Sequence, residues 1–200
     1  TGCEVVWVNR NVTDSFRVGK DGCTNDTSVC RNVSATCQDD GSCVCSGALS
    51  NFRNPIIENP LHHGKYVFGS TYGCIDNSHS LFGVVVADCP FQPFQVLPYS
   101  HTHPATPFSQ NNQLLNCSVE KILVKFPDNA TEMELQWLNE SYIDISVSNN
   151  SLFFKWKRSV PALQGTIITF HLYCKILHQS AIRYINHCLR AKILGRWLAE

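Results

Sequence analysis

Hydrophobic and polar residues alternate in five segments that lie between Cys117 and Cys174. In one of these segments, Ile143, Ile145 and Val147 alternate with polar residues. A period of two predicts half-buried β-strands, each with one face on a core and the other face in water. We therefore expect an antiparallel sheet with one solvated side. The predicted strands span residues 121–126, 132–137, 143–148, 152–157 and 168–173.

Turn signals between the segments set the expected fold class. Asn149 and Asn150 separate the third and fourth predicted strands, and both tolerate the positive φ of a two-residue hairpin turn. Further short strands are predicted at residues 5–8, 65–68 and 81–87. Several short strands that are separated by turns about every 8–12 residues predict a β-sandwich.

Prolines and aromatic residues are interleaved in residues 89–113. The proline density argues against a helix or a central strand, so we expect an extended segment that lies over a surface. Aromatic side chains are favoured anchors in recognition, which makes this segment a candidate binding site. The alternative is that the rings cap an open sheet edge or the end of the sandwich. The candidate ligand-binding residues are Phe91, Phe94, Tyr99 and Phe108.

The last stretch, residues 178–200, departs from the period of two. Ile182, Ile185, Leu189 and Ile193 fall on one face of a helix, and basic residues lie elsewhere on it. The pattern predicts a basic amphipathic helix. Such a helix either touches a membrane surface or a partner, or packs on the sheet.

Composition narrows the class of protein. The chain has 200 residues, enough for one ordinary domain or for a small module beside a medium one. Sixteen basic residues balance sixteen acidic ones, so no global field attracts nucleic acid or an anionic membrane. Hydrophobic residues make up 44% of the chain, which supports a packed core. No run of about eighteen apolar residues occurs, so we expect a membrane contact only through a segment outside this chain.

Seven Asn-x-Ser/Thr sequons indicate where the protein matures, because composition alone predicts roughly two. Glycosylation and disulfide formation both require the secretory pathway, and the chain also has eleven cysteines. The expected location is extracellular, either secreted or at the cell surface. A protein partner is then expected on the sugar-free residues 35–115 and 152–200. The predicted glycosylation sites are Asn11, Asn25, Asn32, Asn116, Asn129, Asn139 and Asn149.

Six of the eleven cysteines fall within residues 3–45, which predicts a disulfide-stapled N-terminal element. Five of them are separated by six, six, five and one residues, and Gly41 stands shortly before the closing Cys-x-Cys. Over residues 22–47 this rhythm resembles the epidermal-growth-factor-like module. The five cysteines are Cys23, Cys30, Cys37, Cys43 and Cys45.

The resemblance implies disulfides Cys23–Cys37 and Cys30–Cys43, with Cys45 bonded to a sixth cysteine. The sixth cysteine of the family is displaced here, because twenty-eight residues separate Cys45 from Cys74. Cys45 therefore pairs either with Cys74 or with Cys3. The calcium-binding members of the family need several acidic residues before the first cysteine, and Asp21 alone predicts no calcium site.

The remaining cysteines include Cys89, Cys117, Cys174 and Cys188. Eleven is an odd number, so at least one thiol is free or bonded to another chain. Cys188, in the predicted terminal helix, is the candidate for the unpaired thiol, and the other ten are predicted to form disulfides.

Histidines raise the possibility of a metal site. His101 and His103, together with His62 and His63, could supply imidazole ligands, but zinc or copper needs a third and a fourth ligand in a fixed geometry. Solvated histidines in a proline-rich loop are the simpler interpretation. No metalloprotease, nucleophile-elbow or phosphate-loop motif occurs, and oxidised cysteines are not available as nucleophiles. We therefore expect neither an enzyme nor a cofactor or metal.

The sequence thus predicts a mainly β protein in four parts. These are a growth-factor-like element at 1–48, a linker at 49–64, an antiparallel β-sandwich at 65–177 and the basic segment 178–200. The expected function is non-catalytic recognition of another extracellular protein or a glycan. The alternatives are a secreted effector or toxin with a membrane-active basic tail, and a histidine-dependent metal enzyme.

Overall fold

The structure, a computed structural model, is mainly β, as predicted. Its helical segments among the described residues are short, α1 (Ser28–Arg31) and the 3-10 helix η2 (Pro161–Leu163). The described residues are 4–5, 14–76, 84–87, 89–90, 95–100, 106–109, 113–127, 129–194 and 196–199.

The strands form five sheets of two to five strands each. In chain order they are β1 (Glu4–Val5), β2 (Ser15–Val18), β3 (Thr36–Cys37), β4 (Cys43–Val44), β5 (Asn51–Arg53), β6 (Ile56–Glu58), β7 (Tyr66–Phe68), β8 (Gly73–Ile75), β9 (Val85–Val86), β10 (Cys89–Pro90), β11 (Gln95–Pro98), β12 (Thr106–Ser109), β13 (Gln113–Lys125), β14 (Met133–Glu134), β15 (Ile143–Ser148), β16 (Ser151–Trp156), β17 (Ile167–His178), β18 (Ala181–Leu194) and β19 (Arg196–Ala199).

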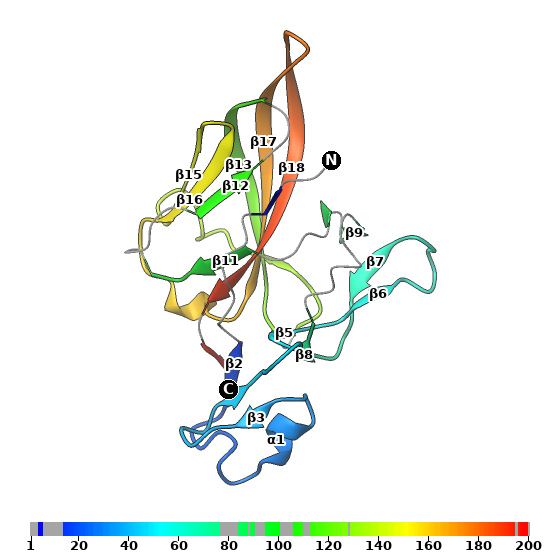
Figure 1. The fold of residues 1–200 in the computed structure, drawn as a ribbon, viewed down its shortest axis with the longest axis vertical. Helices are drawn as coiled ribbons and strands as arrows, with labels where there is room; N and C mark the ends of the chain where they lie inside the picture. The colour runs from blue at the N-terminus through cyan, green and yellow to red at the C-terminus, as the bar shows by residue number, and fades with distance from the viewer. Residues whose placement is uncertain are drawn as a thin grey trace.

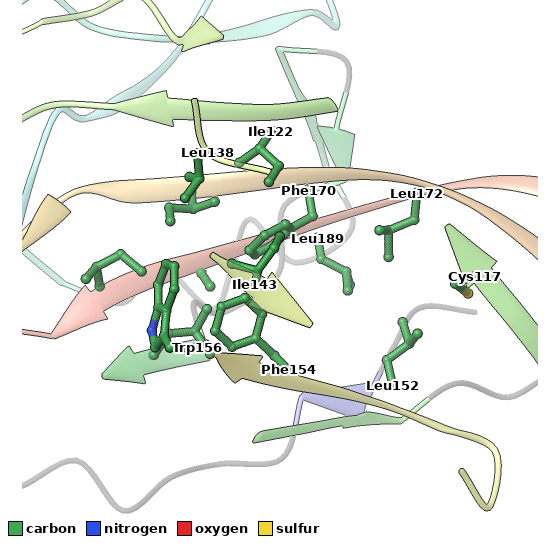
Figure 2. Close-up of a cluster of buried hydrophobic side chains, with 14 of the residues drawn as sticks. Cys117, Ile122, Leu138, Ile143, Leu152, Phe154, Trp156, Phe170, Leu172 and Leu189 are labelled. Atoms are coloured by element: carbon green, nitrogen blue, oxygen red, sulfur yellow. The ribbon is translucent and has the colours of Figure 1, made fainter. Parts of the chain in front are cut away.

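Two of the sheets pack face to face as the predicted sandwich (Figure 1). One has the order β11-β18-β17-β13-β14 and the other β1-β12-β16-β15, and all pairings are antiparallel except β11 with β18. The main core lies between them (Figure 2). There the ring of Phe154 lies 4.8 Å from that of Trp156 and 5.4 Å from that of Phe170, so aromatic side chains of both layers meet.

The hairpin predicted at Asn149 and Asn150 is confirmed. Both residues have positive φ, 49° and 62°, and β15 and β16 pair up to the turn. The strand predicted at 132–137 is much shorter, because only β14 is a strand and the chain then turns. Its alternation reflects no sheet face, since Met133 and Trp137 are 39% and 44% exposed.

The expectation that residues 89–113 contain no central strand is wrong. The segment supplies β10, β11 and β12, and β12 lies between β1 and β16. Within the described residues, β1 pairs with Phe108 and Ser109 and not with Pro107, so Pro107 has a paired neighbour there on the β16 side alone, which is a position where proline is tolerated.

The helix predicted at residues 178–200 is also wrong, because β18 and β19 occupy this stretch. Residues 181–192 of β18 pair antiparallel with the whole of β17, after a turn at Gln179 and Ser180 with φ of 50° and 64°. Neither residue is a usual hairpin residue, so the sequence lacks a turn signal.

The apolar side chains of β18 fit the period of two of a strand as well as the period of 3.6 of a helix. Leu189, Ala191 and Ile193 alternate along the strand and are buried in the main core, although Leu189 and Ile193 also share a helical face. Non-local pairing with β17 decides between the two interpretations.

The cysteine-rich element at the N-terminal side forms a separate small sheet, with the order β19-β2-β4-β3. β19 runs parallel to β2, so the end of the chain completes a sheet that the beginning of the chain starts. Phe16, Phe52 and Trp197 pack in a second core with the cysteines of this element. The element is thus built from both ends of the sequence (Figure 1).

Candidate functional site

Among the described residues, ten cysteines are joined in disulfides, and the bonds include those that the growth-factor-like resemblance implies. Cys45 bonds to Cys74, which decides between the two partners left open by the sequence. The five disulfides are Cys23–Cys37, Cys30–Cys43, Cys45–Cys74, Cys89–Cys188 and Cys117–Cys174. Ten oxidised cysteines indicate an oxidising compartment.

The prediction that Cys188 is unpaired is wrong. Because β18 is a strand that passes β10, the Cα atoms of Cys188 and Cys89 lie 5.6 Å apart and their sulfurs are bonded. Cys3 lies outside the described residues. Because the other ten cysteines are bonded to one another, the predicted disulfide of Cys3 within this chain has no partner left, and Cys3 rather than Cys188 is the odd one of the eleven.

The predicted glycosylation sites are accessible where the structure describes them. Five of the asparagines are exposed, and Asn129 is partly buried. Asn11 lies outside the described residues. The exposed asparagines are Asn25, Asn32, Asn116, Asn139 and Asn149.

The predicted aromatic binding site does not form one exposed patch in the described chain. Tyr99 is partly buried and packs against the main core, so it contributes to folding. Phe108 is part of β12, where it pairs with Leu152. Phe91 and Phe94 lie outside the described residues.

The metal hypothesis finds no ligand set in the parts of the chain that are described. Cys23, Cys30 and Cys37 bring their sulfurs within 4.8 Å of one another, but all three are in disulfides and offer no thiolate. His62 and His63 are exposed on the β6–β7 loop. His101 and His103 fall in an undescribed segment.

Two basic residues of β18, Arg190 and Lys192, have structural roles. Arg190 is 5% exposed and lies on the face of the sheet opposite the main core. Its Nε donates to Thr169 Oγ1 at 3.1 Å and lies 3.4 Å from Glu132 Oε1. Its two terminal nitrogens donate to the carbonyls of Cys89 and Ala87. Arg190 thereby joins the sandwich to the small sheet that contains β9 and β10.

Lys192, also buried, joins the sandwich to the cysteine-rich element. Its Nζ lies 3.4 Å from Asp14 Oδ2 and donates to the carbonyls of Phe52 at 2.9 Å and Gly165 at 2.6 Å. The same Asp14 oxygen accepts a hydrogen bond from the Phe52 amide at 2.8 Å. The charges of Arg190 and Lys192 are buried in these contacts and cannot bind a membrane surface. Two of the basic residues on which the hypothesis of a membrane-active tail depends are therefore occupied.

The β17–β18 hairpin extends past the other strands of the sandwich, at the end away from the cysteine-rich element (Figure 1). On its outer face, Tyr173 and Tyr184 are 41% and 57% exposed, and their rings stack with centroids 5.4 Å apart. Nearer the tip, Ile182 is 56% exposed and is paired with Leu177. We call these four residues the hairpin patch.

The register places a sequon beside the hairpin patch. Asn116 pairs with Lys175, which in turn pairs with Tyr184, so the three residues form a row across β13, β17 and β18. Directly paired residues point to the same face of a sheet. The sequon residue Asn116 therefore lies at the β13 side of the patch, and β17 and β18 carry no sequon themselves.

Sequence reasoning missed the hairpin patch. Tyr173 falls on the polar face of its predicted strand, which is a signal that could have been found. Tyr184 could not be placed next to it, because that contact depends on pairing with a strand that the sequence predicts as a helix.

The described part of the sandwich carries surface pockets, of which two bear on function. One of about 460 Å³, at the open edge between β13 and β15, is lined by exposed charged residues that include Glu120, Glu134 and Glu140. The other, of about 380 Å³, is lined by His171 and Lys121 among others. Burial, followed by the positive charge of Lys121, lowers the pKa of His171, which favours its neutral form.

No helix within the described ranges is long and apolar enough to cross a membrane. No protein-family model matches the sequence, and comparisons with curated proteins and with solved structures found no match. The hypothesis about function therefore depends on the geometry of the chain itself.

Proposed function

We propose that this protein is a non-catalytic extracellular recognition module, a disulfide-stapled glycoprotein that binds another extracellular protein through the hairpin patch. Five disulfides and accessible sequons support the location. The disulfides Cys89–Cys188 and Cys117–Cys174 brace the strands that carry the patch, and the buried Lys192–Asp14 pair joins the sandwich to the cysteine-rich element, so the patch is presented on a rigid support.

The observation that carries the proposal is the pair of stacked tyrosines on a projecting hairpin. Tyrosine is enriched at binding hot spots, since it buries a large apolar area and keeps a polar group for the rim. Tyr173 and Tyr184 already hold each other by stacking, so little freedom is lost when a partner covers them. Ile182 extends the apolar surface toward the tip.

Charge indicates the chemistry of the partner. No acidic residue occurs in residues 158–199, and Lys175 lies beside Tyr184 on the outer face. Arg183 is paired with the core residue Ile176 and belongs to the other face of the hairpin. The partner surface is therefore acidic and apolar. A protein fits better than a sulfated polysaccharide, because the single cation Lys175 on this face gives little electrostatic affinity for a polyanion, whereas the aromatic area suits a protein surface.

The direction of approach follows from the register. A glycan on Asn116 restricts access from β13, so the partner approaches from β18 and the hairpin tip. Over residues 181–187, β17 is the single strand paired with β18 in the described chain, which leaves that edge open.

The test uses the secreted protein against an array of purified extracellular domains, with immobilised heparin as a separate arm. Tyr184→Ala and Ile182→Ala are expected to weaken binding by about tenfold or more, the effect of losing a hot spot. Ile57→Ala is the matched control, because Ile57 is 46% exposed on a different hairpin. Binding should not change in this control.

Two outcomes would count against the proposal. One is protein binding that all three variants leave unchanged, which would place the site elsewhere. The other is binding to heparin alone that disappears when Lys175 and Arg183 are replaced, which would make the ligand an anionic polysaccharide.

A further inference from the structure

The loop between β14 and β15 carries the sequon of Asn139, and its geometry leaves one side-chain atom free. Asn139 Oδ1 accepts hydrogen bonds from the Ser141 amide at 2.9 Å and from the Ser141 hydroxyl at 2.7 Å. The Asn139 carbonyl accepts from the amides of Tyr142 and Ile143. Within the described structure, Nδ2 of Asn139 has no partner. Nδ2 is the atom that carries an N-linked sugar, so this exposed turn presents the acceptor atom to solvent.

Trp137, two residues before Asn139, is a large apolar side chain that the protein covers incompletely. It is 44% exposed, whereas Trp156 and Trp197 are 2% and 7% exposed. Its indole makes an edge-to-face contact with Tyr142, at 5.1 Å between ring centroids and an angle of 72°. The rest of its aromatic surface is open to a further group.

Leu138, which lies between Trp137 and Asn139, anchors this turn in the core. Its side chain is 3% exposed and belongs to the main core (Figure 2). The side chains of Trp137 and Asn139, on either side of Leu138, are both exposed on the surface. Their Cα atoms are at most about 7 Å apart, since a single residue separates them. One pyranose ring attached to Nδ2 covers that span.

We propose that the first N-acetylglucosamine of a glycan on Asn139 packs its apolar face on the indole of Trp137. One face of the pyranose ring presents C–H groups, and the negative face of an aromatic ring attracts such weakly positive hydrogens. The sugar's hydroxyl groups stay in water. The inference rests on the proposed function, because only a protein of the secretory pathway receives this glycan.

The covalent bond makes the glycan the occupant of this surface. A sugar tethered to Asn139 has a high effective concentration at Trp137, so even a weak contact is formed most of the time. A contact between the sugar and the indole holds the turn that places Leu138 and Ile143 in the core. The glycan therefore stabilises the folded chain through Trp137.

The neighbouring pocket of about 460 Å³ offers a different position for the sugar. Asn139 lines it together with Leu135 and Gln136, but Trp137 does not. A sugar inside this pocket would stabilise the turn without the indole, and the two positions are separated by replacing Trp137.

The experiment is a double-mutant cycle on protein secreted from glycosylating cells, with wild type, Asn139→Gln, Trp137→Leu and the double variant. Asn139→Gln is expected to lower Tm by about 2–4 °C when Trp137 is present, which corresponds to about a fivefold change in the unfolding equilibrium. In the Trp137→Leu background the loss should fall to about 1 °C or less. Enzymatic removal of the glycan from native protein should speed hydrogen exchange at the amides of residues 138–143.

Asn32→Gln is the matched control. Asn32 is an exposed sequon residue, but the residue two places before it is Cys30, which is buried in a disulfide. The effect of Asn32→Gln on Tm should be the same with Trp137 and with Trp137→Leu.

The inference would be overturned if Asn139→Gln lowered Tm equally with Trp137 and with Trp137→Leu, or lowered it in neither. Glycopeptide mass spectrometry separates this result from a failure of the proposed function. A bare Asn139 beside glycosylated Asn25 and Asn32 overturns the inference alone. Sugar at no sequon overturns the glycoprotein proposal as well.

Discussion

Lys192→Met tests the buried contact that joins the sandwich to the cysteine-rich element. Lys192 is 3% exposed, and its Nζ lies 3.4 Å from Asp14 Oδ2. The substitution keeps a chain of similar length and removes the charge. It also leaves the carbonyls of Phe52 and Gly165 without this donor.

The expected loss of stability follows from the distance between Lys192 and Asp14 and from the burial of Lys192. Two unit charges 3.4 Å apart interact by about 5 kcal/mol at an effective dielectric constant of about 20. Removing one partner of a buried pair typically costs about 3–5 kcal/mol, because the other charge stays desolvated. Methionine recovers some apolar packing, so we expect a loss of about 3 kcal/mol. For a chain of this size that lowers Tm by about 6–12 °C.

Thermal and denaturant unfolding followed by circular dichroism measure the loss. Arg183→Met is the matched control, since Arg183 lies on the same strand but is exposed, and its replacement should change stability by about 0.5 kcal/mol or less. Asp14→Asn combined with Lys192→Met should cost less than the sum of the two single changes. If Lys192→Met and Arg183→Met lower the free energy of unfolding equally, Lys192 is not buried against Asp14 and the reasoning is refuted.

Two further predictions concern β18 and its turn. Burial lowers the pKa of His187 to about 4 from an ordinary 6.5. The unfolded chain therefore binds this proton at higher pH than the folded chain, and stability falls by roughly 3 kcal/mol as pH drops from 6.5 to 4. His187→Leu should flatten this part of the stability–pH curve, and a curve parallel to wild type would contradict the prediction. Ser180→Gly should stabilise the protein by about 0.5–1 kcal/mol, because Ser180 has φ of 64°, and a lower Tm in thermal unfolding would count against it.

The sandwich was largely predictable because its signals are local. Along 143–148 and 152–157 the period of two gave the strands, and the asparagines between them gave the turn. The same rule failed at 132–137, where Trp137 and Met133 alternate with polar residues although the chain turns after Glu134. Periodicity records residue types and cannot show whether a neighbouring strand is present.

The candidate site was less predictable, because it depends on contacts between distant parts of the chain. The aromatic side chains nominated from the sequence include Tyr99, which packs on the core. Tyr173 and Tyr184 meet only because β17 and β18 are paired. A sequence pattern gives the type of a residue, but its exposure depends on what packs against it.

The sequence by itself determined the mainly β class, the oxidising compartment indicated by the cysteines, and the strands with clear alternation. Tertiary structure alone decided that residues 181–194 form a strand, that Cys188 bonds to Cys89, and that Lys192 is buried against Asp14. The physical reason is that the apolar residues of this stretch satisfy a period of 3.6 as well as a period of 2. Pairing with β17 and burial of the two basic side chains against other segments settle the choice, and neither can be read from neighbouring residues.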